Sequence, residues 1–198
     1  MGFIMDESFY KQQVLSVLGN DFIIYEQVEG VFPIGNIKVI IDFIVFPKNH
    51  LLEKGFEPIY VGIEVKSPTS KKPESKFIDA VFQAHTYSLS LFDGRHLAFV
   101  LLYPPVDDFI GLEKSNKNQS PSVDIEKQTF RVTVERMAQR ANVGFLKIKD
   151  SSWKIFFSGQ CSYYTSRDGK KDIKNIGSVR YVGNTKRLFD IENHRWCK

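Results

Sequence analysis

Two apolar stretches in the first half of the chain carry charged residues in their interior. Residues 39–46 enclose Asp42, and residues 59–66 enclose Glu64 and end with Lys66. Continuous apolar runs of this length, rich in β-branched residues, are typical of strands that are buried on both faces of a sheet. An unpaired carboxylate in such a strand costs several kcal/mol or stays protonated. These three charges therefore require partners, and a metal ion is the simplest candidate.

Hydrophobic periodicity along the rest of the chain predicts alternating helices and strands. Asp6 and Glu7 lie at the start of the first helix, where the helix dipole favours negative charge. The pattern predicts helices at residues 5–18, 76–92 and 132–141, strands at 22–32, 37–46, 59–66, 96–103, 143–149 and 153–157, and polar loops at 33–36, 47–58, 67–75 and 107–128. This order predicts an α/β fold in which helices flank a mixed central β-sheet.

Length and composition are those of a globular protein. The chain has 198 residues, of which 42% are hydrophobic and 25% charged, so it can form a core domain and a small appendage. We expect the core at residues 1–157 and a C-terminal extension at 158–198. No apolar segment approaches the roughly 18 residues that cross a membrane, and the chain start lacks a signal-peptide pattern. A cytoplasmic, intracellular protein without membrane contact is therefore expected.

Positive charge is concentrated at the C-terminal end. Residues 147–198 carry 12 Lys and Arg against 5 Asp and Glu, whereas residues 1–146 have a net charge of −3. Aromatic residues such as Trp153, Tyr181 and Trp196 are interspersed with these cations. Cations contact phosphates and aromatic faces stack on unpaired bases, so this segment favours a nucleic-acid partner. The alternative is a β-rich tail in which the aromatic side chains form a small core.

The three embedded charges are expected to meet at one place. Side chains two residues apart in a strand point to the same face, so Glu64 and Lys66 project together, and Asp42 joins them if its strand is adjacent. Carboxylate oxygens, together with the backbone carbonyl of Val65 and waters, form the oxygen shell that Mg²⁺ or Mn²⁺ prefers. Lys66 is then placed to stabilise developing negative charge or to position a water. The alternative is a buried ion pair of Asp42 with Lys66.

Asp42 followed by Glu64–Val65–Lys66, in the order helix, hairpin, strand, helix, strand, resembles the PD-(D/E)xK nuclease superfamily. The resemblance covers residues 5–103 and extends at most to 157. It implies a restriction-endonuclease-like core, here with a basic β-rich C-terminal extension. It also implies that the two acids hold Mg²⁺ while the lysine assists the attack of water on a phosphodiester. Ile41 stands where the proline of the superfamily name would be.

Further candidates for the site come from the flanking helices and the first strand. Many members of that superfamily use an additional acid from the first helix, for which Glu7 is a candidate and Glu26, within strand 22–32, is a rival. Glu7 facing water is the alternative. Gln83 and Tyr87 lie four residues apart, hence on one side of their helix. They are similar to a pair that orients the lysine and contacts the substrate backbone in some of these nucleases, although any half-buried helix shows a polar stripe.

Other reactive side chains do not form a recognisable site. Cys161, Cys197 and His194 offer three zinc ligands, but a closed structural zinc site needs four, so free thiols are expected. His85 is expected to be a packed or surface histidine.

Together these features predict a Mg²⁺-dependent deoxyribonuclease, with an endonuclease favoured. The alternatives are a catalytically inactive nuclease-fold module that binds DNA or a protein, and an RNA-directed nuclease that shares every residue of the DNA enzyme. A homodimer is a further alternative, because symmetric dimers suit the cutting of two strands.

Overall fold

A single mixed sheet forms the centre of the molecule. The computed structural model describes residues 6–69, 71–111, 125–158, 161–167, 169–170, 189–190 and 195–196. Within these residues one sheet has eight strands that follow each other in sequence order: β1 (Phe22–Phe32), β2 (Ile37–Pro47), β3 (Val61–Val65), β4 (Phe99–Tyr103), β5 (Val143–Lys149), β6 (Ser152–Ser158), β7 (Cys161–Thr165) and β8 (Gly169–Lys170). Strands β9 (Phe189–Asp190) and β10 (Arg195–Trp196) form a separate antiparallel pair.

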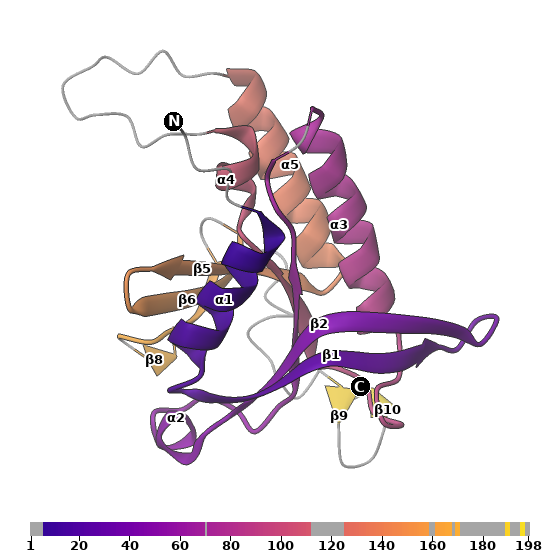
Figure 1. Cartoon of the computed structure of the whole chain (residues 1–198), viewed down its shortest axis with the longest axis vertical. Coiled ribbons are helices and arrows are strands. Elements are labelled where there is room, and N and C mark those ends of the chain that lie inside the picture. Colours follow the sequence, from indigo (N-terminus) through magenta and orange to yellow (C-terminus); the bar gives the residue numbers. More distant parts are fainter. Residues whose placement is uncertain are drawn as a thin grey trace.

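The strand directions and the helices confirm the predicted α/β fold with a mixed sheet. Strands β1, β2 and β3 pair antiparallel, β3, β4 and β5 pair parallel, and β5 to β8 pair antiparallel again. The helices are α1 (Glu7–Leu18), α2 (Asn49–Glu53), α3 (Pro73–Ser88), α4 (Val106–Ile110) and α5 (Ile125–Arg140). Parallel neighbours need a crossover connection. Helix α3 provides it between β3 and β4, and α3 and α5 lie alongside each other (Figure 1).

The sheet separates two hydrophobic cores, which we call the α1-side core and the α3-side core. Alternate residues of β4 show the division: Phe99 and Leu101 belong to the α1-side core, whereas Val100 and Leu102 belong to the α3-side core with α3, α4 and α5. This is the period of two expected for a strand buried on both faces. Every residue of β3 and of β4 is buried, as the apolar runs predict.

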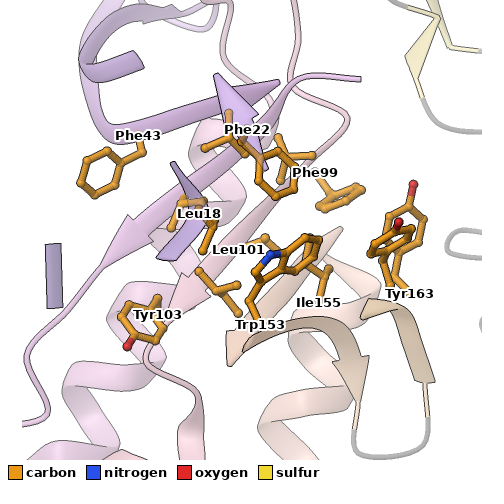
Figure 2. Close-up of a cluster of buried hydrophobic side chains, with 14 of the residues drawn as sticks. Leu18, Phe22, Phe43, Phe99, Leu101, Tyr103, Trp153, Ile155 and Tyr163 are labelled. Atoms are coloured by element: carbon orange, nitrogen blue, oxygen red, sulfur yellow. The ribbon is translucent and has the colours of Figure 1, made fainter. Parts of the chain in front are cut away.

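Aromatic side chains fill the α1-side core (Figure 2). Trp153 of β6 packs against Phe22, with ring centroids 5.1 Å apart, and stacks on Tyr164 of β7 at 5.5 Å. Tyr163, also on β7, contacts Phe99 at 5.3 Å. Strand β7 lies in the segment that the sequence analysis separates as an extension, and it therefore contributes side chains to the same core as α1.

The predicted elements agree with the structure for the hairpin and the strands, and differ in the helices. Helix α2 lies within 47–58, expected as a loop, because Leu51 is buried in the α1-side core. Helix α3 begins at Pro73 rather than at residue 76, since proline suits the first turn of a helix. Helix α4, apart from Val106, and the first turn of α5 lie within 107–128, which was expected as a loop. The apolar residues of α4 are buried in the α3-side core, a contact that periodicity in a polar segment does not reveal, whereas Ile125 at the start of α5 is exposed.

Parts of the predicted extension lie outside the described residues. These parts include most of the basic aromatic segment beyond residue 170, and the side chains of Cys161, His194 and Cys197. Strand β7 pairs with β6, and β8 pairs with β7. In the described part of the chain no helix is long and apolar enough to cross a membrane.

Candidate functional site

The candidate site lies where β2 and β3 separate. Strand β2 pairs with β1 from Ile37 to Pro47 except at Asp42, opposite Gln27, but it pairs with β3 only from Val45, opposite Val61, to Phe43, opposite Ile63. Beyond this point the β1–β2 hairpin extends away from the rest of the sheet (Figure 1). Asp42 is the first residue of β2 past the last pair, so its side chain lies in the fork between the two strands.

Strand β2 twists at Asp42. Ile41 is buried in the α3-side core, whereas Phe43, two residues on, is buried in the α1-side core, so the regular alternation of faces breaks between them. The Oδ2 atom of Asp42 accepts a hydrogen bond of 2.9 Å from the backbone N–H of Val65. The carboxylate of Asp42 thus accepts a hydrogen bond from the β3 backbone at the point where the backbone pairing of β2 with β3 ends.

The second oxygen of Asp42 accepts two more hydrogen bonds. Lys11 of α1 lies 2.8 Å from Oδ1, and Gln27 of β1 donates to the same atom at 2.9 Å. Gln27 has a φ of 49°, a left-handed conformation that costs a residue other than glycine about 1 kcal/mol. Lys11 also lies 2.9 Å from Glu7. Desolvation opposes the charge of Lys11, but its hydrogen bonds to Asp42 and Glu7 raise the pKa of Lys11 above its usual value.

Glu64 is the most deeply buried charge of the site, with 3% of its surface exposed. Ile63 and Val65 face the α1-side core, so Glu64 lies on the α3 side of the sheet. Its Oε1 atom lies 2.6 Å from Nζ of Lys66, whereas its Oε2 atom has no hydrogen-bond partner among the described residues. Burial, together with the negative charge of Asp42, raises the pKa of Glu64 to about 7, and Lys66 offsets only part of this effect.

Gln83 and Tyr87 support β2 from α3. The Tyr87 hydroxyl donates a hydrogen bond of 2.7 Å to the carbonyl of Ile40, and Gln83 Nε2 donates to the Tyr87 oxygen at 2.5 Å. Burial and the nearby charge of Glu64 raise the pKa of Tyr87 to about 12. Gln83 and Tyr87 therefore lie together, and they hold the backbone of β2 two residues before Asp42. These hydrogen bonds run to β2 and not to Lys66, the residue that the resemblance implies the pair orients.

The structure brings most of the predicted site residues together. Lys66 forms its ion pair with Glu64. The alternative prediction, a buried ion pair of Asp42 with Lys66, is therefore wrong. Glu7 reaches Asp42 through Lys11. Val65 contacts Asp42 through its N–H, whereas the sequence analysis invoked its carbonyl.

Two other side chains lie away from these contacts. Glu26 is exposed and lines a cavity of about 470 Å³ with Tyr60, Phe92 and Arg95, and neither Asp42 nor Glu64 is among the lining residues of that cavity. Nδ1 of His85 lies 3.0 Å from the carbonyl of Ala141, as expected for a packed histidine.

Sequence reasoning missed two residues of the site, Lys11 and Gln27. A signal existed for Lys11, because it follows Glu7 by four residues and such pairs share one side of a helix. No sequence pattern marks Gln27, which is one of several polar residues in an exposed edge strand.

The donors around the fork fit a divalent cation that prefers oxygen ligands. Among the described residues, no group of three or more His, Cys, Asp and Glu side chains is placed to hold a metal ion. Mg²⁺, however, is commonly bound by one or two carboxylates and completes its shell with waters and substrate phosphates. Asp42 and Glu64 provide two such carboxylates, and Oε2 of Glu64 is a buried acceptor that lacks a donor.

In comparisons with known proteins, no family model, no curated protein and no solved structure matches this chain. The chemistry of the fork supplies the basis for a functional assignment.

Proposed function

We propose that this protein is a Mg²⁺-dependent deoxyribonuclease, favouring endonucleolytic cleavage, with a restriction-endonuclease-like core of the PD-(D/E)xK type. The order α1, β1–β2 hairpin, β3, α3 and parallel β4 supports this core, with Asp42 and Glu64–Val65–Lys66 at the fork. The observation that carries the proposal is the Oε2 atom of Glu64. It is buried beside a second carboxylate and has no donor in the described part of the chain.

A purely structural role explains this atom poorly. A buried charge is normally paired and hydrogen-bonded, because a carboxylate without donors keeps most of its desolvation cost. Lys66 satisfies one oxygen of Glu64 and leaves the other unsatisfied. A divalent cation between Asp42 and Glu64 would compensate both negative charges. When bound, Mg²⁺ would supply a Lewis acid that lowers the pKa of a coordinated water and stabilises negative charge on phosphate oxygens.

The residues of the chain then have distinct roles. Asp42 and Glu64 hold the cation, and the side chain of Lys66, which is 23% exposed, is held by Glu64 where it can contact a substrate phosphate. Gln83 and Tyr87 keep β2, and with it Asp42, in place. Exposed lysines at 71 and 72, before α3, and the basic segment 147–198 suit a polyanionic partner.

Cleavage assays test this proposal directly. Full-length protein is incubated with duplex, single-stranded and branched DNA and with RNA, in Mg²⁺, Mn²⁺ or EDTA. We expect metal-dependent cleavage of DNA that Glu64→Gln and Lys66→Met each reduce at least a hundredfold. Lys38→Met is the matched control, because Lys38 forms an exposed ion pair with Glu29. Cleavage that persists in Glu64→Gln protein would exclude this site.

One observation favours a second candidate, a non-catalytic module on the same core. Asp42 already accepts hydrogen bonds from Lys11, Gln27 and Val65, as a structural carboxylate would. Such a module would bind DNA or a protein in the absence of divalent metal. Salt-dependent DNA binding that survives Asp42→Asn and Glu64→Gln, without cleavage of any substrate, would favour it over the nuclease.

A further inference from the structure

We propose that Lys11 takes the place of a divalent cation at Asp42 in the metal-free protein, and that its displacement sets the metal affinity of the site and releases Glu7 as a third carboxylate. This inference rests on the proposed function; its new element is the competing role of Lys11, whereas an acid from the first helix is already implied by the resemblance. Lys11 thereby becomes a positioning residue in the resting state and a competitor of the metal.

The contacts of Lys11 resemble those of a small cation. Its Nζ atom lies 2.8 Å from Oδ1 of Asp42 and 2.9 Å from Oε1 of Glu7, so two carboxylates from separate elements converge on one positive charge. The side chain of Asp42 is 11% exposed and that of Lys11 is 29% exposed. The ammonium group therefore supplies the charge and donors that Asp42 needs when no metal is bound.

The backbone that carries Lys11 is held firmly against the sheet. Asp6 caps α1 by accepting a hydrogen bond of 3.1 Å from Phe9. Further along α1, Val14 is fully buried, and Gln13 accepts a hydrogen bond of 2.5 Å from the hydroxyl of Tyr103 on β4. The position of Lys11 Cα is thus fixed, while its long side chain keeps a route to solvent.

Among the donors to Asp42, Lys11 is the one that an incoming cation repels. The Val65 N–H belongs to the backbone of a fully buried strand, and Gln27 is an exposed residue on the adjacent strand whose amide carries no charge. Lys11 has four side-chain torsions, is partly exposed, and carries a positive charge that repels an incoming cation. Binding of a divalent cation to Oδ1 of Asp42 is therefore expected to displace Lys11. That cost lowers the apparent affinity for metal.

Titration calorimetry with Mn²⁺ as the only ligand tests this inference without an activity readout. Lys11→Met keeps an apolar chain of similar length and removes the competing charge, so the full-length variant should bind Mn²⁺ about fivefold more tightly than the wild type. Lys11→Arg keeps the charge and should bind like the wild type. Equal or weaker binding by Lys11→Met would overturn the inference, because it would show that Lys11 only holds Asp42 in position.

A second variant tests the part played by Glu7. In the Lys11→Met background, Glu7→Gln should remove most of the gain in Mn²⁺ affinity, since Glu7 is then a metal ligand. In the wild-type background Glu7→Gln should change the Mn²⁺ affinity less. The difference between the effects of Glu7→Gln in the two backgrounds is the coupling free energy of a double-mutant cycle. A gain that survives Glu7→Gln would remove Glu7 from the site. Circular dichroism of each variant confirms that α1 remains folded.

The outcomes separate this inference from the proposed function. If the wild type binds Mn²⁺ and cleaves DNA but Lys11→Met binds no more tightly, only the role of Lys11 is refuted. If only Lys11→Met binds Mn²⁺, competition by Lys11 is supported even though the wild type shows no metal site. If neither protein binds Mn²⁺ and no DNA is cleaved, the proposed function fails, and the inference with it.

Discussion

Replacing Glu64 by glutamine should stabilise the metal-free protein at neutral and alkaline pH. Glu64 is 3% exposed, lies near the charge of Asp42, and leaves Oε2 without a donor among the described residues. Glutamine has nearly the same shape and retains an oxygen that can accept the hydrogen bond from Lys66. It removes the negative charge, which is the unfavourable part of the buried group in the absence of metal.

The size and sign of the effect follow from the pKa. Burial and Asp42 raise the pKa of Glu64 from 4.5 to about 7, a difference that corresponds to about 3 kcal/mol. The folded state therefore binds this proton more tightly than the unfolded state. The Glu64 contribution to stability is full below pH 4.5, falls as the pH rises to about 7, and stays low above that. Burying the NH₂ group of glutamine costs about 1 kcal/mol, so Glu64→Gln should raise the free energy of unfolding by about 2 kcal/mol at pH 8.

Urea unfolding in EDTA at pH 5 and pH 8 measures this gain. From pH 5 to pH 8 the free energy of unfolding of the wild type should fall relative to that of Glu64→Gln. Addition of Mn²⁺ should restore this free energy in the wild type alone. Glu29→Gln is the control, because Glu29 forms an exposed ion pair with Lys38. The reasoning is refuted if Glu64→Gln is less stable than the wild type at pH 8, or if both proteins respond equally to pH.

Three further substitutions should behave differently. Asp42→Asn removes the charge that Lys11 pairs with, so it should lower the free energy of unfolding by about 1 to 3 kcal/mol in EDTA, opposite in sign to Glu64→Gln; an increase would contradict the assigned contacts. Tyr87→Phe removes the hydrogen bond to the β2 carbonyl and should cost about 1 kcal/mol in urea unfolding and lower the DNA cleavage rate; unchanged cleavage would show that this bond does not position Asp42. Asp21→Ala leaves the indole N–H of Trp153 without the acceptor that lies 2.6 Å away, so thermal unfolding should show a loss of about 1 to 3 kcal/mol while Mn²⁺ affinity stays constant; a change in affinity would mean that this contact supports the site.

Local pattern was sufficient for most of the strands and for the residues that mark the site. Strand β3 is buried throughout, as its apolar residues predict. In β2 the prediction of burial on both faces holds only from Ile41 onwards, whereas Ile37 and Ile40 are exposed in the part of the hairpin that extends beyond β3. Asp42 and Glu64 stood out because charge inside such a run is costly wherever the strand is placed. That energetic rule depends only on composition along the chain, so it identifies charged residues that require partners before any fold is known.

The partners of Asp42 were decided by the tertiary structure, whereas the pairing of Glu64 with Lys66, two residues apart in one strand, is local. Lys11 and Gln27 meet Asp42 because α1 packs on one face of the sheet and β2 twists where it leaves β3, and neither event has a local signature. Helices α2 and α4 likewise form in segments of loop-like composition because their few apolar residues are buried against distant elements. The amino-acid sequence by itself determined which residues could not be left without a partner. The arrangement of strands and helices determined the partners of Asp42, because those contacts join residues far apart in the chain.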